Sequence, residues 1–261
     1  MNIVVIIKQV PEIELVRVDE SAGQVTLPSG PGVVNPFDEY GIEEALKIKE
    51  QLGGKVTLLT LGSERAESAL RQGLSVGADE AFLVTDPAFE ESDPQATAKI
   101  LAAAIKKVGE VGLVLAGKQA IDDDSAQVPA AVAANLDWPQ VLFVRKTESI
   151  SDAEAVFQRI NEEGYDTVTT ALPAVVSVVK EINEPRLPSL KGKMAAKKAP
   201  VTKWSAADLD VDGGVVGKNS PSKTITASSP PPRQRGEIVE GETPEEIAEK
   251  LVQKLRDDQA L

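Results

Sequence analysis

Residues 2–7 read Asn2-Ile3-Val4-Val5-Ile6-Ile7, and the strand that they predict extends to Val10. A strand covered on both faces carries apolar side chains at successive positions, whereas a half-exposed strand alternates apolar and polar residues. This run therefore predicts a central strand of a parallel sheet that has helices on both of its faces.

Strands and amphipathic helices alternate after this run. The repeating strand–helix–strand order predicts right-handed crossovers and an α/β fold with a mostly parallel sheet and flanking helices. We expect a Ser cap to open the second helix and Pro129 to lie in the first turn of the fourth. The expected strands are Val56–Leu61, Ala81–Val84 and Leu113–Gly117, and the expected helices are Asp38–Leu52, Ser63–Val76, Asp93–Val108 and Ser125–Leu136.

The rhythm changes beyond Leu136. Short β-branched runs divided by turn residues are typical of antiparallel strands, and we expect such strands to extend the sheet. They are Val141–Thr147, Ala155–Asn161, Asp166–Thr170 and Ala174–Val179.

Regular patterning fades from Asn183 onward and predicts an extended arm, including the tract Asn219–Arg235. The arm ends in Thr243-Pro244-Glu245-Glu246, a capping box with proline at the first helical position. Apolar residues then recur on one helical face at Ile247, Leu251 and Leu255. An isolated helix of roughly 15 residues is marginal in water, so this face must pack on the parent domain or on another protein.

Composition limits the chemistry of the chain. It has 261 residues, 28 Lys and Arg against 41 Asp and Glu, a net charge of -13, and neither His nor Cys. The charge disfavours nucleic acid as a partner, and the two absences exclude histidine-dependent triads, thiolate nucleophiles and common zinc sites. No apolar run approaches the ~20 residues of a membrane span, and no signal peptide is evident. We expect a soluble, cytoplasmic binding protein, or one whose chemistry belongs to a cofactor.

Ligands of open α/β sheets bind at the carboxyl ends of the strands. Three loops meet this condition: the segment after Val10, Gly62-Ser63, and Gly117–Gln127. Backbone N–H groups at a helix start can hold an anion, although the same turns also serve as plain helix caps. The triplet Asp122-Asp123-Asp124 invites a metal hypothesis, but consecutive carboxylates diverge in direction, which favours capping of the next helix.

A basic stretch stands out in this acidic chain. Apolar residues are interleaved with its charges, which favours contact with a partner, and the alternative is a solvated loop. The basic residues are Lys191, Lys193, Lys197 and Lys198, and the apolar ones are Leu187, Leu190 and Met194.

The segment Gly117-Lys118-Gln119-Ala120-Ile121-Asp122-Asp123-Asp124, followed by Leu136-Asp137-Trp138-Pro139-Gln140, resembles the β subunit of the electron transfer flavoproteins. Asn35-Pro36-Phe37, Leu172-Pro173-Ala174 and Asn183-Glu184-Pro185-Arg186 follow the family's order. The resemblance covers residues 2 to about 200. It implies a nucleotide-binding α/β domain over residues 1–200 and, over 201–261, a linker and capped helix that dock on the partner subunit.

The resemblance implies a heterodimer with an α subunit, which holds the redox-active FAD, while this chain holds AMP as a structural nucleotide. Electrons would pass from flavoprotein dehydrogenases, such as acyl-CoA dehydrogenases, to a membrane quinone oxidoreductase, as in fatty acid oxidation. The chain would carry no catalytic residue and no metal, and it would not insert into the membrane.

The family's nucleotide contacts correspond to Ile6, Asn35, Pro36, Phe37, Asp38, Leu61, Gly117, Lys118, Gln119, Ala120, Ile121, Asp122, Asp123, Asp124, Ser125, Ala126, Gln127 and Val128. The resemblance also places Phe37 near the flavin ring. The family's recognition loop, whose leucine anchors partner dehydrogenases, corresponds to Leu187, Pro188, Ser189, Leu190, Lys191, Gly192, Lys193, Met194, Ala195 and Ala196, with Leu190 as the anchor.

Two departures and two alternatives accompany the resemblance. Ile13 stands where some members have a tyrosine near the flavin, and Glu162-Glu163-Gly164 replaces a common Asp-Gly-Gly turn. Bifurcating members bind a second FAD in place of AMP, and Asp123 here replaces a glycine of their loop, which favours AMP. A stress-type ATP-binding module is another alternative, but it leaves the Leu190 segment and the arm unexplained.

Overall fold

The computed structural model describes residues 1–232 and 236–261. The predicted first strand is β1 (Asn2–Ile6), which lies in the interior of the main sheet. It pairs in parallel with β6 (Lys55–Leu61) on one side and β8 (Leu113–Gly117) on the other. Ile3, Val4 and Val5 are fully buried. The prediction of a strand covered on both faces is confirmed.

The main sheet has nine strands in the order β11-β10-β9-β12-β8-β1-β6-β7-β13. The expected mixture of parallel and antiparallel strands is confirmed, but the position of β12 is not an extension of the sheet. It lies between β8 and β9 and runs parallel to both. Four of its five residues are apolar and all five are buried, which suits a strand covered on both faces. The other strands of this sheet are β7 (Glu80–Val84), β9 (Gln140–Ile150), β10 (Glu154–Asn161), β11 (Gly164–Ala171), β12 (Ala174–Val178) and β13 (Thr202–Trp204).

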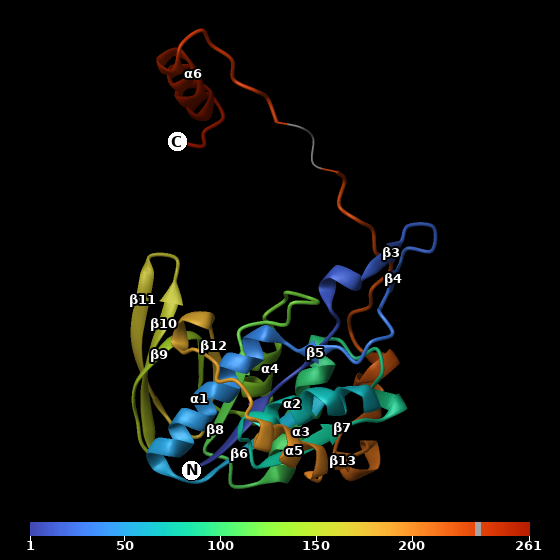
Figure 1. The fold of residues 1–261 in the computed structure, drawn as a ribbon. Coiled ribbons are helices and arrows are strands. Elements are labelled where there is room, and N and C mark those ends of the chain that lie inside the picture. Colours follow the sequence, from blue (N-terminus) through green and yellow to red (C-terminus); the bar gives the residue numbers. More distant parts are fainter. Residues whose placement is uncertain (233–235) are drawn as a thin grey trace. The chain divides into compact units, whose positions relative to one another are not determined.

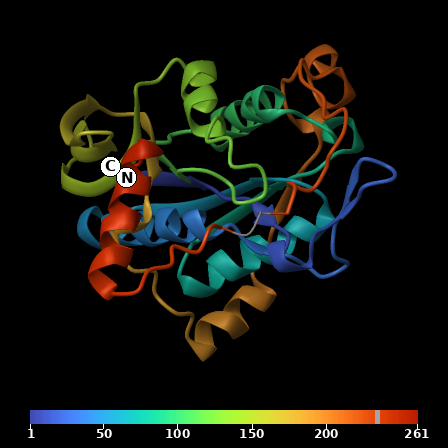
Figure 2. The ribbon, with the colours of Figure 1, turned by 90° about the horizontal axis from the view of Figure 1, so that it is seen from above.

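Helices cover both faces of the sheet, as seen from above in Figure 2. The first face carries α1 (Pro36–Leu52), α2 (Glu67–Val76) and α5 (Leu190–Lys198). The second carries α3 (Pro94–Val108) and α4 (Val128–Leu136).

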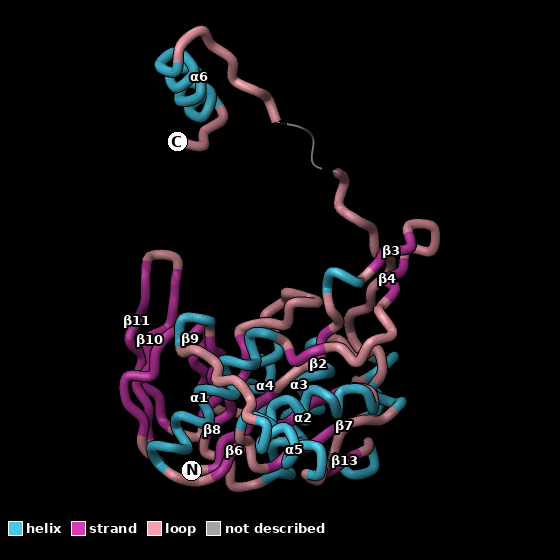
Figure 3. Tube along the Cα trace, in the orientation of Figure 1, coloured by secondary structure: helices cyan, strands magenta, loops and turns pink. Residues whose placement is uncertain are grey.

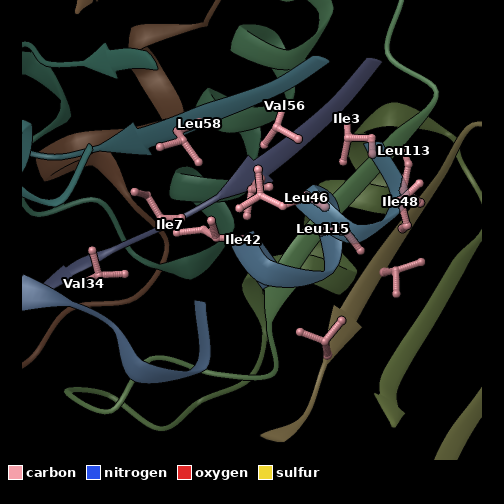
Figure 4. Packing of buried hydrophobic residues seen from close by; sticks show 14 of the residues in the cluster. Ile3, Ile7, Val34, Ile42, Leu46, Ile48, Val56, Leu58, Leu113 and Leu115 are labelled. Carbon is pink, nitrogen blue, oxygen red and sulfur yellow. The ribbon is translucent and has the colours of Figure 1, made fainter. Parts of the chain in front are cut away.

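Two hydrophobic cores lie on these two faces. Successive residues of β1 serve them alternately: Ile3 and Val5 belong to the first core, and Val4 and Ile6 to the second. This follows from the period of two along a strand. Figure 4 shows the packing of the first core around Ile3, Ile7, Val34, Ile42, Leu46, Ile48, Val56, Leu58, Leu113 and Leu115.

Two expected helix starts are wrong. The side chain of Ser63 makes no cap bond, because a 3-10 turn, η2 (Glu64–Ala66), comes before α2. The fourth helix begins at Val128 instead of Ser125, since Asp124 and Ala126 adopt positive φ angles of 56° and 55° that end any earlier helical turn. Pro129 lies in the first turn of α4, as predicted.

Strands β9, β10 and β11 pair antiparallel to one another and form one end of the main sheet, and β13 forms the other edge (Figure 3). Residues Glu162 and Glu163 form the turn between β10 and β11. Two small antiparallel ribbons lie outside the main sheet: β2 (Gln9–Val10) with β5 (Val33–Val34), and β3 (Arg17–Asp19) with β4 (Gln24–Thr26).

The chain forms two compact units, Met1–Ala227 and Ser228–Leu261. The division that we expect after residue 200 lies inside the first unit, because β13 pairs in parallel with β7. The segment after Asn183 is therefore not wholly an extended arm: it contains α5, β13 and the short turns η5 (Ala206–Asp208), η6 (Gly213–Val215) and η7 (Gly217–Asn219). Residues 233–235 of the predicted tract lie outside the described residues.

The second unit contains α6 (Pro244–Asp257), drawn in red in Figure 1. The Thr243 hydroxyl accepts the Glu246 N–H at 3.2 Å, as the capping box predicts. The return bond differs, because the Glu246 carboxylate accepts the N–H of Glu242. No residue of α6 is buried, and Leu251 is 45% exposed. None of the helices in the described parts of the chain has the length and apolar content to cross a membrane.

A cavity made in the first core should lower the stability of the fold substantially. Replacing the fully buried Leu58 by alanine should lower the free energy of unfolding by about 2–5 kcal/mol. The matched control is Leu27→Ala, at a leucine that is 60% exposed, which should change stability by less than about 0.5 kcal/mol. Urea unfolding followed by circular dichroism measures both, and equal shifts in the two variants would contradict this account of the core.

Candidate functional site

A cavity of about 780 Å³ opens at the carboxyl ends of β1, β6, β7 and β8. Ile6, Leu61 and Gly117 contribute from the strand ends, and Thr85 follows directly after β7. Parallel strands bring all their carboxyl ends to one edge of a sheet. The cavity therefore lies where the sequence predicts a ligand.

The carboxylate of Asp38, at the start of α1, joins three segments beside this cavity. One oxygen accepts the Lys8 N–H at 2.7 Å, and the other accepts the Gly117 N–H at 3.1 Å and the Asn35 amide at 2.9 Å. The Asn35 side chain continues the network, donating to the Gln119 carbonyl at 2.8 Å and accepting the Ile121 N–H at 3.2 Å. Asp38 thus positions the loops, since the hydrogen bonds of both its oxygens stay within the protein.

Burial raises the pKa of Asp38 to about 7, although the hydrogen bonds from Asn35, Lys8 and Gly117 oppose the shift. A buried carboxylate loses its hydration, and this penalty falls on the charged form. The site therefore contains a group whose protonation changes near neutral pH.

Gly117 is required at its position by contact and not by its backbone angles. A Cβ atom there would lie 2.4 Å from the Asp38 carboxylate and 2.7 Å from Phe37. No side chain fits between β8 and α1 at this point.

The loop before α4 has the geometry of an anion-binding site. Ala126 has a φ of 55°, and Gln127 after it is helical, with φ and ψ of -88° and -35°. This succession of left- and right-handed residues makes neighbouring N–H groups converge. Within residues 1–232 and 236–261, the N–H groups of Ala126, Gln127 and Val128 have no acceptor, and all three residues line the cavity. They are free to bind a phosphate.

The acidic triplet is used within the protein. Lys8 Nζ lies 2.8 Å from Asp122 and 3.6 Å from Asp123. Asp123 also accepts the Ser125 N–H at 3.1 Å, and the Gln119 amide donates to Asp124. The interpretation that the triplet caps the next helix is wrong, because α4 starts later and has Gln127 at its cap. No group of His, Cys, Asp or Glu with a geometry suited to a metal ion occurs among the described residues.

The structure brings most of the predicted nucleotide residues to this cavity. Those that line it are Ile6, Asn35, Asp38, Leu61, Gly117, Gln119, Ala120, Asp123, Ser125, Ala126, Gln127 and Val128. Pro36, Phe37, Lys118, Ile121, Asp122 and Asp124 do not line it.

Phe37 and Lys118 face a second cavity, of about 610 Å³. The Lys118 ammonium lies 5.0 Å from the centre of the Phe37 ring, within reach of a cation–π interaction. These two predicted residues are thus adjacent to the main cavity but separate from it.

Sequence reasoning missed one wall of the main cavity. This wall is formed by Thr85, Asp86, Pro87, Phe89, Glu90, Glu91 and Ser92. They carry no motif, but they follow the carboxyl end of β7, and the strand-end rule applied to Ala81–Val84 points to them.

The predicted recognition segment is a helix over much of its length. The expectation of an irregular loop is wrong, because Ser189 caps α5 by accepting the Gly192 N–H at 3.0 Å and good helix formers follow. Leu187, Leu190 and Met194 are 91%, 77% and 59% exposed, whereas Ala196 is buried. We call α5 together with Leu187–Ser189 the docking segment.

These features define a class: an α/β protein with a mostly parallel sheet and, at the carboxyl ends of its parallel strands, a cavity lined by unpaired backbone N–H groups. A family model described as "Electron transfer flavoprotein domain" matches residues 25–209. The electron transfer flavoprotein subunit beta of Thermoanaerobacterium thermosaccharolyticum is 43% identical over 98% of both chains. The caffeyl-CoA reductase-Etf complex subunit CarD of Acetobacterium woodii is 41% identical over 98% of both. The subunit beta of Clostridium acetobutylicum is 39% identical over 99% of both.

The chain belongs to the electron transfer flavoprotein β-subunit family. Membership implies an electron carrier that is associated with flavin and has an α subunit as partner. The resemblance in the sequence is thereby confirmed.

The raised pKa of Asp38 predicts a specific pH dependence. The folded protein holds this proton more tightly than the unfolded chain, so the contribution of Asp38 to stability falls as pH rises from about 4 to about 7. The difference in unfolding free energy between the native protein and Asp38→Asn should therefore decrease over this range and level off above it. Urea unfolding at several pH values measures the difference, and an increase with pH would contradict the raised pKa.

Proposed function

We propose that this chain is the β subunit of a heterodimer whose α subunit holds FAD, and that the chain itself holds AMP and supplies the docking segment. Electrons pass from flavoprotein dehydrogenases, such as acyl-CoA dehydrogenases, through the α-subunit flavin to a membrane quinone oxidoreductase. The observation that carries the nucleotide part of the proposal is the set of free N–H groups at Ala126, Gln127 and Val128.

The loop before α4 can bind a phosphate although acidic side chains lie near it. Asp122 and Asp123 share the ammonium of Lys8, which offsets one of their two negative charges. The three N–H groups supply uncharged donors and lie at the positive end of the α4 dipole. These residues fit a nucleotide phosphate, which they would hold and orient.

The choice of AMP over a second FAD rests on Asp123. Its side chain stands where the bifurcating loop has glycine, and it occupies space beside the phosphate loop. Lys8, which Asp123 shares with Asp122, offsets only part of this charge, so both the size and the charge of the Asp123 side chain disfavour a second diphosphate.

A second FAD is the alternative, and one observation favours it. The cavity continues past the phosphate loop to Thr85 and Ser92 and is larger than a mononucleotide requires. Both arrangements use the same anion loop, so the nucleotide content of the protein must distinguish them.

The docking segment has the composition of a partner surface. Its three large apolar side chains are exposed, and residues 186–203 contain six basic and no acidic residues in a chain of net charge -13. An apolar anchor with a basic surround fits a partner that has an apolar pocket and an acidic rim. The relative CarD is a subunit of a caffeyl-CoA reductase complex, which supports a partner enzyme that acts on CoA thioesters.

The nucleotide content tests the proposal. The chain is co-expressed with its α subunit, the purified heterodimer is heat-denatured, and the released nucleotides are quantified by chromatography and mass spectrometry. We expect one FAD and one AMP per heterodimer. Two FAD and no AMP would establish the alternative.

A variant of the loop tests the reason for the choice. Asp123→Gly combined with Ser125→Thr should allow FAD into the β-subunit cavity, with a corresponding loss of AMP. Ser125→Thr alone is the matched control, since it leaves the Asp123 side chain in place. Unchanged nucleotide content in the double variant would overturn the explanation by size and charge.

Leu190 is predicted to anchor the partner dehydrogenase. Burying a leucine contributes about 1.5–3 kcal/mol, so Leu190→Ala should raise the KM for the dehydrogenase by about tenfold or more. The control Leu27→Ala removes an exposed leucine outside the docking segment and should leave KM unchanged. Steady-state electron transfer from dehydrogenase to heterodimer provides the measurement, and an unaltered KM for Leu190→Ala would remove the anchor role.

A further inference from the structure

The docking helix α5 depends on its neighbour α2 for a defined position. It has nine residues, of which only Ala196 is buried. A helix of this length is unstable alone in water, and its exposed side chains can present a fixed surface only if its backbone is held. The contacts that hold it come mainly from α2 (Figure 2).

Arg71 of α2 binds the carboxyl end of α5. Its Nη1 donates to the carbonyl of Ala196 at 2.6 Å and to that of Ala199 at 3.3 Å. The last carbonyls of a helix have no partner within the helix and carry partial negative charge. The Arg71 guanidinium supplies both the missing hydrogen-bond donor and a positive charge at the carboxyl end of α5.

Glu67, one turn earlier on α2, orients Arg71. One carboxylate oxygen accepts from Arg71 Nε at 2.9 Å and from Nη2 at 2.6 Å. The other lies 3.2 Å from the Lys203 ammonium of β13, which also pairs with Glu64 at the cavity wall. The Arg71 hydrogen bond is the main cause that lowers the pKa of Glu67, with Lys203 adding to the shift. Glu67 therefore stays charged and keeps the guanidinium in place.

The first turn of α5 lies directly against α2. A Cβ atom on Gly192 would lie 2.2 Å from the Ser75 carbonyl oxygen, so only glycine permits this approach. On the amino-terminal side, Arg186 binds Glu43 through two nitrogens, at 2.8 and 2.9 Å. The docking segment is thus held at both ends and at its centre.

We propose that Arg71 is the positioning residue of the docking segment: by binding the Ala196 and Ala199 carbonyls it fixes the direction in which Leu190 and Met194 are presented. The positioning itself is independent of any partner. Its consequence for electron transfer rests on the proposed docking function.

Hydrogen exchange of the heterodimer tests the positioning. Arg71→Gln keeps a polar side chain but loses the charge, the Nη1 bonds to the two α5-end carbonyls and the two-nitrogen contact with Glu67. The amides of Lys193 and Ala199, which close the helical turns of α5, should exchange about tenfold faster, because a hydrogen bond to a charged group contributes about that factor. The amides of β1 should not change. The control is Lys49→Gln, which breaks the ion pair between Lys49 on α1 and Asp79, the residue before β7, and should leave exchange in α5 unaltered.

Gly192→Ala is the second variant, and it keeps every charge. It should also accelerate exchange in α5, because the added methyl group cannot approach the Ser75 carbonyl. If exchange of Lys193 and Ala199 is unchanged in Arg71→Gln, the positioning role of Arg71 is overturned.

Kinetics separates this inference from the docking function. With a partner flavoprotein dehydrogenase, Arg71→Gln should raise KM severalfold and leave kcat unchanged, since the flavin site is untouched. Arg71→Lys keeps the charge without the fork and should lie between the native protein and Arg71→Gln. Faster exchange with an unchanged KM would establish the positioning role of Arg71 and overturn docking through α5.

Discussion

A carboxylate buried at the carboxyl edge of a parallel sheet organises this protein. Asp38 accepts N–H groups from Lys8 and Gly117 and the amide of Asn35, and so ties the segments after β1 and β8 to the start of α1. Backbone N–H groups at the ends of the strands have no partner in a neighbouring strand, and the buried Asp38 carboxylate accepts their hydrogen bonds. This one group therefore fixes the loops around the main cavity.

The cavity and the docking segment share their supporting helices. Helix α1 carries Asp38 at its start and Glu43, the partner of Arg186, one turn later. Helix α2 follows Glu64 at the cavity wall and carries Arg71 against α5. Both sites therefore stand on rigid elements packed into the same hydrophobic core, which suits a carrier that presents a fixed surface to its partners.

The division of chemistry follows from the residues available. The chain has neither His nor Cys, and its buried acid Asp38 is fully used in holding loops. The anion site that we propose consists of the backbone N–H groups of Ala126, Gln127 and Val128, which would bind a phosphate without reacting. A protein of this kind contributes shape, charge and contact, and the flavin contributes the electron chemistry.

The sequence by itself determined the parallel α/β core, the strand-end location of the site and the family, because the buried run Ile3–Ile7 and the motif Gly117–Asp124 are local patterns. The tertiary structure decided three features that depend on contacts between residues far apart in the chain. Strand β12 lies inside the sheet because its apolar residues need cover on both faces. The wall Thr85–Ser92 joins the cavity through the position of β7. The Ser189 cap and the helix formers after it favour helix α5 locally, but Arg71, over a hundred residues earlier in the chain, binds its carboxyl end and sets where it lies. Local periodicity carries no information on such partners, since they meet only when the chain is folded.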